Sequence, residues 1–221
     1  MDVKLPKKTG NKKQETRNRN LSFKFRVYSF KFRAAFTLIE LLIVITLFGL
    51  STSLITASYL TFERNNRVKQ ASLTLKNDLR LIQNYALTGN KNSPPATCPI
   101  GDNIRLNGWY IYLVGGANNY QVKLSCIDIS NGNISNITNK TVTLPRDVTI
   151  EKVELTLGVL EPQLAVMFEP LTNQAKFYNI EPGSGATVSS QDLLTLTFSR
   201  SGANPYKVKV RASSGQVNEE K

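Results

Sequence analysis

The chain has 221 residues, which is enough for one ordinary domain with additional segments. Residues 1–35 hold 11 of the 28 Lys and Arg but only two of the 16 Asp and Glu, so they carry +9 of the formal net charge of +12. The sequence contains no histidine, which excludes His-based general-base catalysis, Ser-His-Asp triads and most zinc sites. We therefore expect no catalytic residue, metal or cofactor.

The basic N-terminal segment has the composition of a disordered leader. Residues 1–33 are polar and basic with few branched apolar side chains, which is typical of a segment on the inner side of a membrane. The stretch "FKFRVYSFKFR" alternates aromatic and basic residues, so an RNA-binding arm is an alternative. The excess of cations on the inner side of membrane helices accounts for the same charges more simply.

An apolar segment follows the leader. Between Arg33 and Glu63 the only charged residue is Glu40. As a helix, this length suffices to cross a bilayer core of ~30 Å. It is too long for a signal peptide and lacks a small-x-small cleavage pattern at a natural end. The basic flank predicts a single-pass helix with a cytoplasmic N-terminus and an extracytoplasmic C-terminal body.

The helix is expected to continue beyond the apolar segment as an amphipathic helix. Glu63 and Arg67 are spaced for an ion pair on its polar side. Gly89 is a suitable stop signal, so one helix is predicted from about Phe36 to Thr88. Apolar residues recur at helical spacing over its second half, at Val68, Ala71, Leu75, Leu79, Ile82 and Ala86.

The pattern then changes to strands and turns, and helix first with strands afterwards predicts an α+β fold with an antiparallel sheet. The long N-terminal helix, with a transmembrane half and an amphipathic half, would pack on this β-rich C-terminal domain. The expected segments are residues 1–35 (leader), 36–62 (membrane helix), 63–88 (amphipathic helix) and 89–221 (β-rich soluble domain). Strands are expected at 108–114, 119–126, 148–157, 164–168, 175–180, 193–198 and 206–211.

Cys98 and Cys126 both follow the membrane segment, where an oxidising compartment makes a disulfide plausible. Two unpaired thiols are the alternative.

Other candidate sites have simple structural interpretations. Asn133, Asn136 and Asn139 begin N-x-S/T triplets, which indicate glycosylation or, as we favour, a polar Asn-rich surface loop. Trp109, with Tyr110 and Tyr112, would form either a ligand platform or, more commonly, a packed strand. The candidates for a catalytic carboxylate pair are better explained as solvated faces or strand edges; they are Glu151, Glu154, Glu161 and Glu169.

Glu40 requires an explanation, because a bare carboxylate in hydrocarbon costs on the order of 3 kcal/mol or more. A side chain that reaches the membrane edge, or stays protonated, gives no reason for an acid at this position. If the chain were cut just before Phe36, the new α-amino group would be a cation close to Glu40. Pairing within the subunit, or with the amine of a neighbouring subunit, would neutralise both charges. The second arrangement gives the acid a role in assembly.

The stretch "AAFTLIELLIVITLFGL" closely resembles the processing site and N-terminal helix of type IV pilins and type II secretion pseudopilins. The resemblance implies removal of the leader between Ala35 and Phe36 by a prepilin peptidase, N-methylation of Phe36, and an assembly contact at Glu40. Gly49 also stands where the family commonly has glycine. More weakly, "NGWYIYL", "VMFEPLTNQAKF" and "YKVKVRASSGQV" are similar to H-type minor pseudopilins and related minor pilins, which end with a strand, a Gly turn and a last strand.

Two departures from the family pattern concern the cut and the helix. Ala35 replaces the usual glycine before the cut, which predicts slower cleavage. The mid-helix proline of major pilins is missing, with Ala57 near its place, which favours a minor subunit. The sequence thus indicates a non-enzymatic minor pilin or pseudopilin of the bacterial cytoplasmic membrane. After processing it would assemble with other pilin subunits into a filament through residues 36–62.

Two alternatives remain open. A minor pilin for DNA uptake would bind nucleic acid through Lys207, Lys209 and Arg211, although strand-face cations are usually only solvated. A signal-anchored exported enzyme or binding protein would need no carboxylate at Glu40, so Glu40→Gln would be silent.

Overall fold

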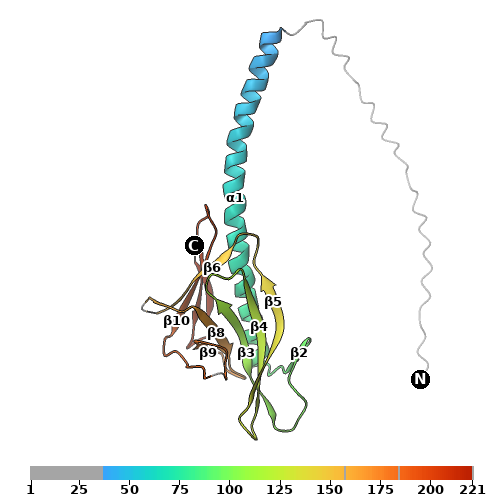
Figure 1. Ribbon diagram of the computed structural model, residues 1–221, viewed down its shortest axis with the longest axis vertical. Helices are drawn as coiled ribbons and strands as arrows, with labels where there is room; N and C mark the ends of the chain where they lie inside the picture. The colour runs from blue at the N-terminus through green and yellow to red at the C-terminus, as the bar shows by residue number, and fades with distance from the viewer. Residues whose placement is uncertain (1–36, 157, 184, 221) are drawn as a thin grey trace, which may run out of the picture. The chain divides into compact units, whose positions relative to one another are not determined.

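The computed structural model describes residues 37–156, 158–183 and 185–220 (Figure 1). The chain divides into two units, Met1–Leu47 and Phe48–Lys221. Helix α1 (Leu38–Leu87) begins in the first unit and continues into the second. Strands follow it: β1 (Asn92–Ser93), β2 (Ala96–Thr97), β3 (Ile104–Val114), β4 (Asn119–Asp128), β5 (Ile134–Thr143), β6 (Thr149–Leu155), β7 (Val159–Leu160), β8 (Gln163–Phe168), β9 (Ala175–Tyr178), β10 (Leu193–Ser199), β11 (Tyr206–Arg211) and β12 (Val217–Glu220).

The strands form two five-stranded sheets and one small hairpin. One sheet has the order β5-β4-β3-β8-β9, the other has the order β12-β11-β10-β6-β7, and β1 pairs with β2. Every pairing between these strands is antiparallel. The predicted α+β class is therefore confirmed, with two sheets where one was expected.

The C-terminal half of α1 is held by its apolar stripe. All six predicted stripe residues, from Val68 to Ala86, have no exposed surface, and they belong to one core cluster with side chains from both five-stranded sheets. Glu63 and Arg67 form the expected ion pair on the helix surface. The helix ends at Leu87, one residue before the predicted end, and Gly89 adopts the left-handed conformation (φ 63°) that commonly terminates helices.

Strand β3 is buried on both faces. Trp109, Ile111 and Leu113 enter the main core, and Trp109 also donates a hydrogen bond to the carbonyl of Asn90 (2.7 Å). Tyr110 points to the opposite face, where it forms a second small cluster with residues of β8. The aromatic run at 109–112 therefore packs as a strand, as the more common interpretation predicted.

The Asn-rich segment after β4 is a strand, which corrects the expectation of a surface loop. Residues 134–143 form β5, which pairs with β4 along its length at one edge of the first sheet. Ile137 and Val142 pack against the core. The segment looked like a loop because an edge strand buries little, so most of its positions hold polar side chains that tolerate water.

Several strand ends also differ from the prediction. Strand β3 begins at Ile104 and β4 extends to Asp128, both beyond the expected limits. Strand β6 ends at Leu155 and β9 at Tyr178, both before the expected limits. Pairing with neighbouring strands sets these ends.

Candidate assembly segment

The first turn of α1 is organised by Thr37. Its carbonyl accepts hydrogen bonds from the amides of Glu40 (3.0 Å) and Leu41 (3.3 Å). Its hydroxyl Oγ1 lies 3.4 Å from the Glu40 amide, the arrangement of a helix N-cap. The spacing Thr-x-x-Glu is a capping-box signal that could have been read from the sequence. Thr37 is thus a residue that sequence reasoning missed.

Glu40 is the only acid in this first turn and it is exposed. A carboxylate in the first turn interacts favourably with the unsatisfied amides and the positive end of the helix dipole. This gives Glu40 a local stabilising role in addition to any contact with another chain. Ala35 and Phe36, the predicted cleavage and methylation positions, lie outside the described residues.

The apolar side chains around Glu40 are unburied. The helix is long and apolar enough to cross a membrane, and none of its most apolar window is buried within the chain. An exposed apolar surface of this extent must be covered by lipid or by other chains. The exposed large apolar residues of this segment include Leu38, Ile39, Leu41, Leu42, Ile43, Val44, Ile45, Leu47, Phe48 and Leu50.

Four hydroxyls of this segment are satisfied inside the helix. Thr46, Ser53 and Thr56 donate to carbonyls one turn earlier at 2.8 Å, and Thr52 does so at 2.7 Å. Polar groups that bond their own helix carry no unsatisfied donor into hydrocarbon. The segment is therefore chemically suited to lipid or to a bundle of helices, with Glu40 as its exceptional residue.

The three cations proposed for nucleic acid all lie on β11. Lys209 pairs with Glu220 of β12 (Nζ–Oε2 2.5 Å), and Arg211 lies 3.7 Å from the carboxylate of Asp192. Lys207 is exposed and faces Glu220 across the register. With acids beside them, these cations present little unbalanced charge to phosphates.

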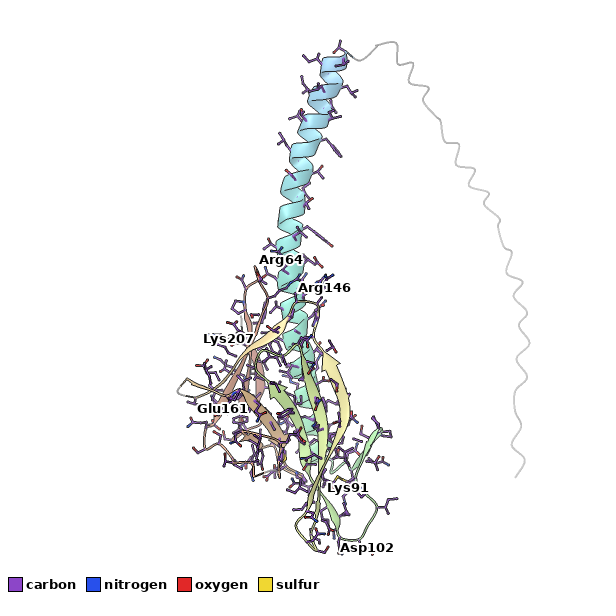
Figure 2. The ribbon with its side chains drawn as sticks, in the orientation of Figure 1. Arg64, Lys91, Asp102, Arg146, Glu161 and Lys207 are labelled. Atoms are coloured by element: carbon purple, nitrogen blue, oxygen red, sulfur yellow. A yellow bond between two sulfur atoms is a disulfide. The ribbon has the colours of Figure 1, made fainter. Side chains whose placement is uncertain are left out.

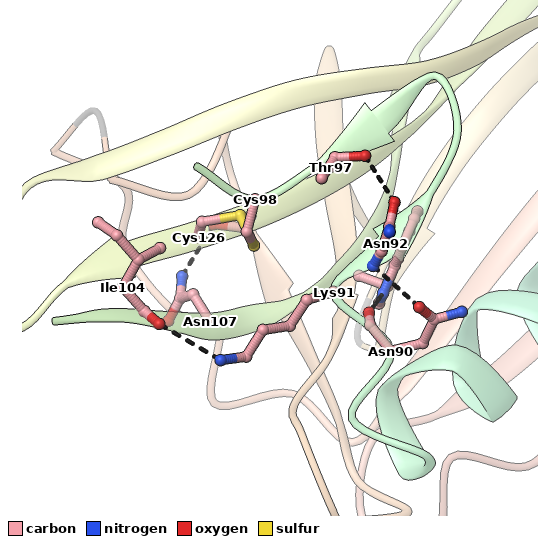
Figure 3. The surroundings of a disulfide bond; sticks show 10 residues. Asn90, Lys91, Asn92, Thr97, Cys98, Ile104, Asn107 and Cys126 are labelled. Carbon is pink, nitrogen blue, oxygen red and sulfur yellow. Dashed lines mark hydrogen bonds between the residues drawn. A yellow bond between two sulfur atoms is a disulfide. The ribbon is translucent and has the colours of Figure 1, made fainter. Parts of the chain in front are cut away.

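Cys98 and Cys126 are joined by a disulfide that ties the segment after β2 to β4 (Figure 3). Hydrogen bonds hold the surrounding segment. Lys91 Nζ donates to the carbonyl of Ile104 (3.3 Å), and Thr97 Oγ1 donates to Asn92 Oδ1 (2.8 Å) (Figure 3). Together these contacts fasten the β1–β2 hairpin to the first sheet.

The remaining candidates do not form a reactive cluster. Glu169 pairs with Lys176 (2.5 Å), and no group of three His, Cys, Asp or Glu suited to a metal ion occurs among the residues that the structure describes. Asn136 donates its amide to the carbonyl of Pro182 (2.8 Å), and Asn139 donates to that of Ser93 (2.6 Å). Both are part-buried, so of the three N-x-S/T asparagines only Asn133 is exposed.

Comparison with known proteins gives one finding. Residues 31–56 match the family model of the prokaryotic N-terminal methylation motif, which includes Ala35, Phe36 and Glu40. No curated protein and no solved structure matches the chain significantly. The matched motif implies processing by a peptidase and assembly with other pilin subunits, and it characterises structural proteins rather than enzymes. The chain therefore carries the N-terminal methylation motif of the type IV pilin and pseudopilin family.

Proposed function

We propose that the protein is a minor pilin or pseudopilin, of the H type or a related kind, that joins a filament through its N-terminal helix. The observation that carries this proposal is the matched motif on the first half of α1, up to Phe62, where large apolar side chains are exposed and the single charge is Glu40. Such an apolar surface must be covered by lipid or by other subunits.

Before assembly, the chain is held in the cytoplasmic membrane by residues 36–62, with the leader in the cytoplasm and the β-rich domain outside. Prepilin peptidase cuts between Ala35 and Phe36 and methylates the new amine. In the filament, that amine and Glu40 of a neighbouring subunit neutralise one another. The absence of a proline at mid-helix and the paired cations of β11 support a minor structural subunit over a DNA-binding one.

The Glu40→Gln variant tests the assembly role. In cells that make the filament, we expect the variant to be inserted and processed but to lose at least about 90% of subunit-to-subunit crosslinks, because a buried amine would lack its partner. The matched control is Glu63→Gln, which alters a half-buried carboxylate already paired with Arg67 on the same helix. Wild-type crosslinking by the Glu40→Gln variant would favour a plain membrane anchor and contradict the proposal.

A further inference from the structure

One end of the second unit lies where the apolar part of α1 gives way to its charged part. Tyr59 and Phe62 are both 63% exposed there, and Arg64 follows within the same turn. Amphipathic aromatic side chains gather at the level of lipid headgroups in membrane helices. If residues 36–62 span the membrane, Arg64 therefore lies at headgroup level on the outer side.

Two loops reach this same level of the helix: the loop between β10 and β11, and the loop that precedes β6. The backbone amide of Asn204 donates to Asn65 Oδ1 (2.9 Å). Arg64 Nη1 lies against Gly202, so close that a Cβ added there would be 2.7 Å from it. The second loop, before β6, is joined to the first by Arg200 and Asp147, whose Nη2 and Oδ2 are 3.2 Å apart.

These contacts gather an unbalanced positive charge. Arg146 is 85% exposed and lies 3.9 Å from the same Asp147 oxygen that Arg200 uses. Figure 2 shows Arg64 and Arg146 at this end, while Lys91 and Asp102 lie at the other end of the strands. Arg146 and Arg200 thus share one carboxylate, and Arg64 adds a third guanidinium group at the same end. Arg200 Nη1 is buried and has no hydrogen-bond partner among the described residues.

We propose that Arg64 and Arg146 bind the phosphate of an anionic phospholipid, such as phosphatidylglycerol, in the outer leaflet, while the largely buried Arg200 holds Asp147 beside them. Guanidinium groups bind phosphate oxygens bidentately, and the exposed rings of Tyr59 and Phe62 would contact the acyl chains of the same lipid. The inference rests on the membrane anchoring proposed above. It adds that the folded domain is docked on the membrane surface until the subunit is extracted into the filament.

The apolar neighbours favour a lipid over the other phosphate sources. Free phosphate or a nucleic acid would use the arginines but would leave the adjacent aromatic surface of α1 in water. A phospholipid satisfies both features, because its headgroup and its chains lie at the two levels that the arginines and the rings occupy. Docking through this end would also orient the strands away from the bilayer.

Native mass spectrometry of the full chain in detergent micelles tests this inference. The chain is titrated with phosphatidylglycerol or phosphatidylcholine, and the populations with bound lipid are compared. We expect Arg146→Gln to lower the preference for phosphatidylglycerol about five-fold, and Arg64→Gln with Arg146→Gln to lower it about 25-fold. Arg105→Gln is the matched control, because Arg105 is an exposed arginine beside Ile104 and Lys91 at the far end. The basic leader is the same in every variant.

The outcomes are distinct. Loss in the Arg146 variant but not in the Arg105 variant supports the inference. Equal losses in both, no preference in the wild type, or equally tight Arg146-dependent binding of inorganic phosphate or a DNA duplex would overturn it. Extraction of the full chain from membranes by alkaline carbonate is measured separately. A chain that is extracted contradicts the membrane anchor itself, whereas an anchored chain without lipid preference contradicts only this inference.

Discussion

Asp78, on the buried face of α1, accepts a hydrogen bond from the hydroxyl of Tyr120 on β4, with 2.7 Å between Oδ2 and Oη. Its other oxygen, Oδ1, accepts from Lys140 of β5 at 2.6 Å. Asp78 is 6% exposed and Tyr120 is fully buried, so this polar contact lies within the interface between the helix and the first sheet. It fixes how the helix that carries the assembly segment is attached to the β-rich domain.

Removing the acid at this contact should destabilise the second unit. Asp78→Ala leaves the buried Tyr120 hydroxyl without its partner, which costs about 1–3 kcal/mol of unfolding free energy. Urea unfolding of the full chain in micelles, followed by the fluorescence of Trp109, measures this change. Asn77→Ala, on the exposed side of the same turn, should stay within about 0.5 kcal/mol. Equal stability of both variants would show that the contact contributes nothing.

Stability at alkaline pH should depend on Tyr120. Burial, and then the hydrogen bond to Asp78, raise the pKa of Tyr120 well above its ordinary value. The folded state therefore keeps this phenol protonated, while the unfolded chain ionises it above about pH 10. The resulting stabilisation is complete below that pH and is lost as the pH rises further. In Tyr120→Phe, unfolding midpoints should fall less steeply above pH 10, and parallel curves for the two proteins would contradict this expectation.

Asp192 should contribute stability only when it is ionised. A hydrogen bond from the backbone amide of Ser213, at 2.8 Å, lowers the pKa of this carboxyl, and nearby Arg211 acts in the same direction. Because the folded-state pKa is lowered, the contribution is present above the ordinary aspartate pKa and is lost as the pH falls through the folded-state value. Asp192→Asn should therefore lower the unfolding midpoint at pH 7 but not at pH 2. A deficit of the same size at both values would point to lost geometry instead of lost charge.

The disulfide between Cys98 and Cys126 closes a loop with a sequence separation of 28. In the chain-entropy model, a loop of this size stabilises the folded state by about 3–4 kcal/mol. The double variant Cys98→Ser with Cys126→Ser should lose stability of this order, and a reductant should lower the midpoint of the wild type but not of the variant. Insensitivity of the wild type to a strong reductant under unfolding conditions would contradict the expectation.

The helix could be predicted closely because its signals are local. The spacing from Val68 to Ala86 encodes the buried face, and Gly89 encodes the stop, so periodicity and a single turn residue suffice. The N-cap at Thr37 is equally local and was available from its spacing to Glu40. The apolar segment likewise encodes its need for lipid or other chains in composition alone.

Contacts between distant segments could not be predicted in the same way. Strand β5 is polar at most positions, and only its pairing with β4 makes it a strand. The contact between Asp78 and Tyr120 joins residues 42 positions apart, and the arginines near Asn65 are gathered by loops from far along the chain. None of these has a spacing signal, because the fold alone brings the partners together.

The intact mass of the chain purified from membranes, with and without an active prepilin peptidase, tests the central claim most directly. We predict that the peptidase removes residues 1–35 and adds one methyl group, so that the mass equals that of residues 36–221 plus one methylene. Ala35→Gly should be processed at least as completely. A full-length chain in both backgrounds would contradict the account, since Glu40 would then have no cleaved, methylated amine to pair with.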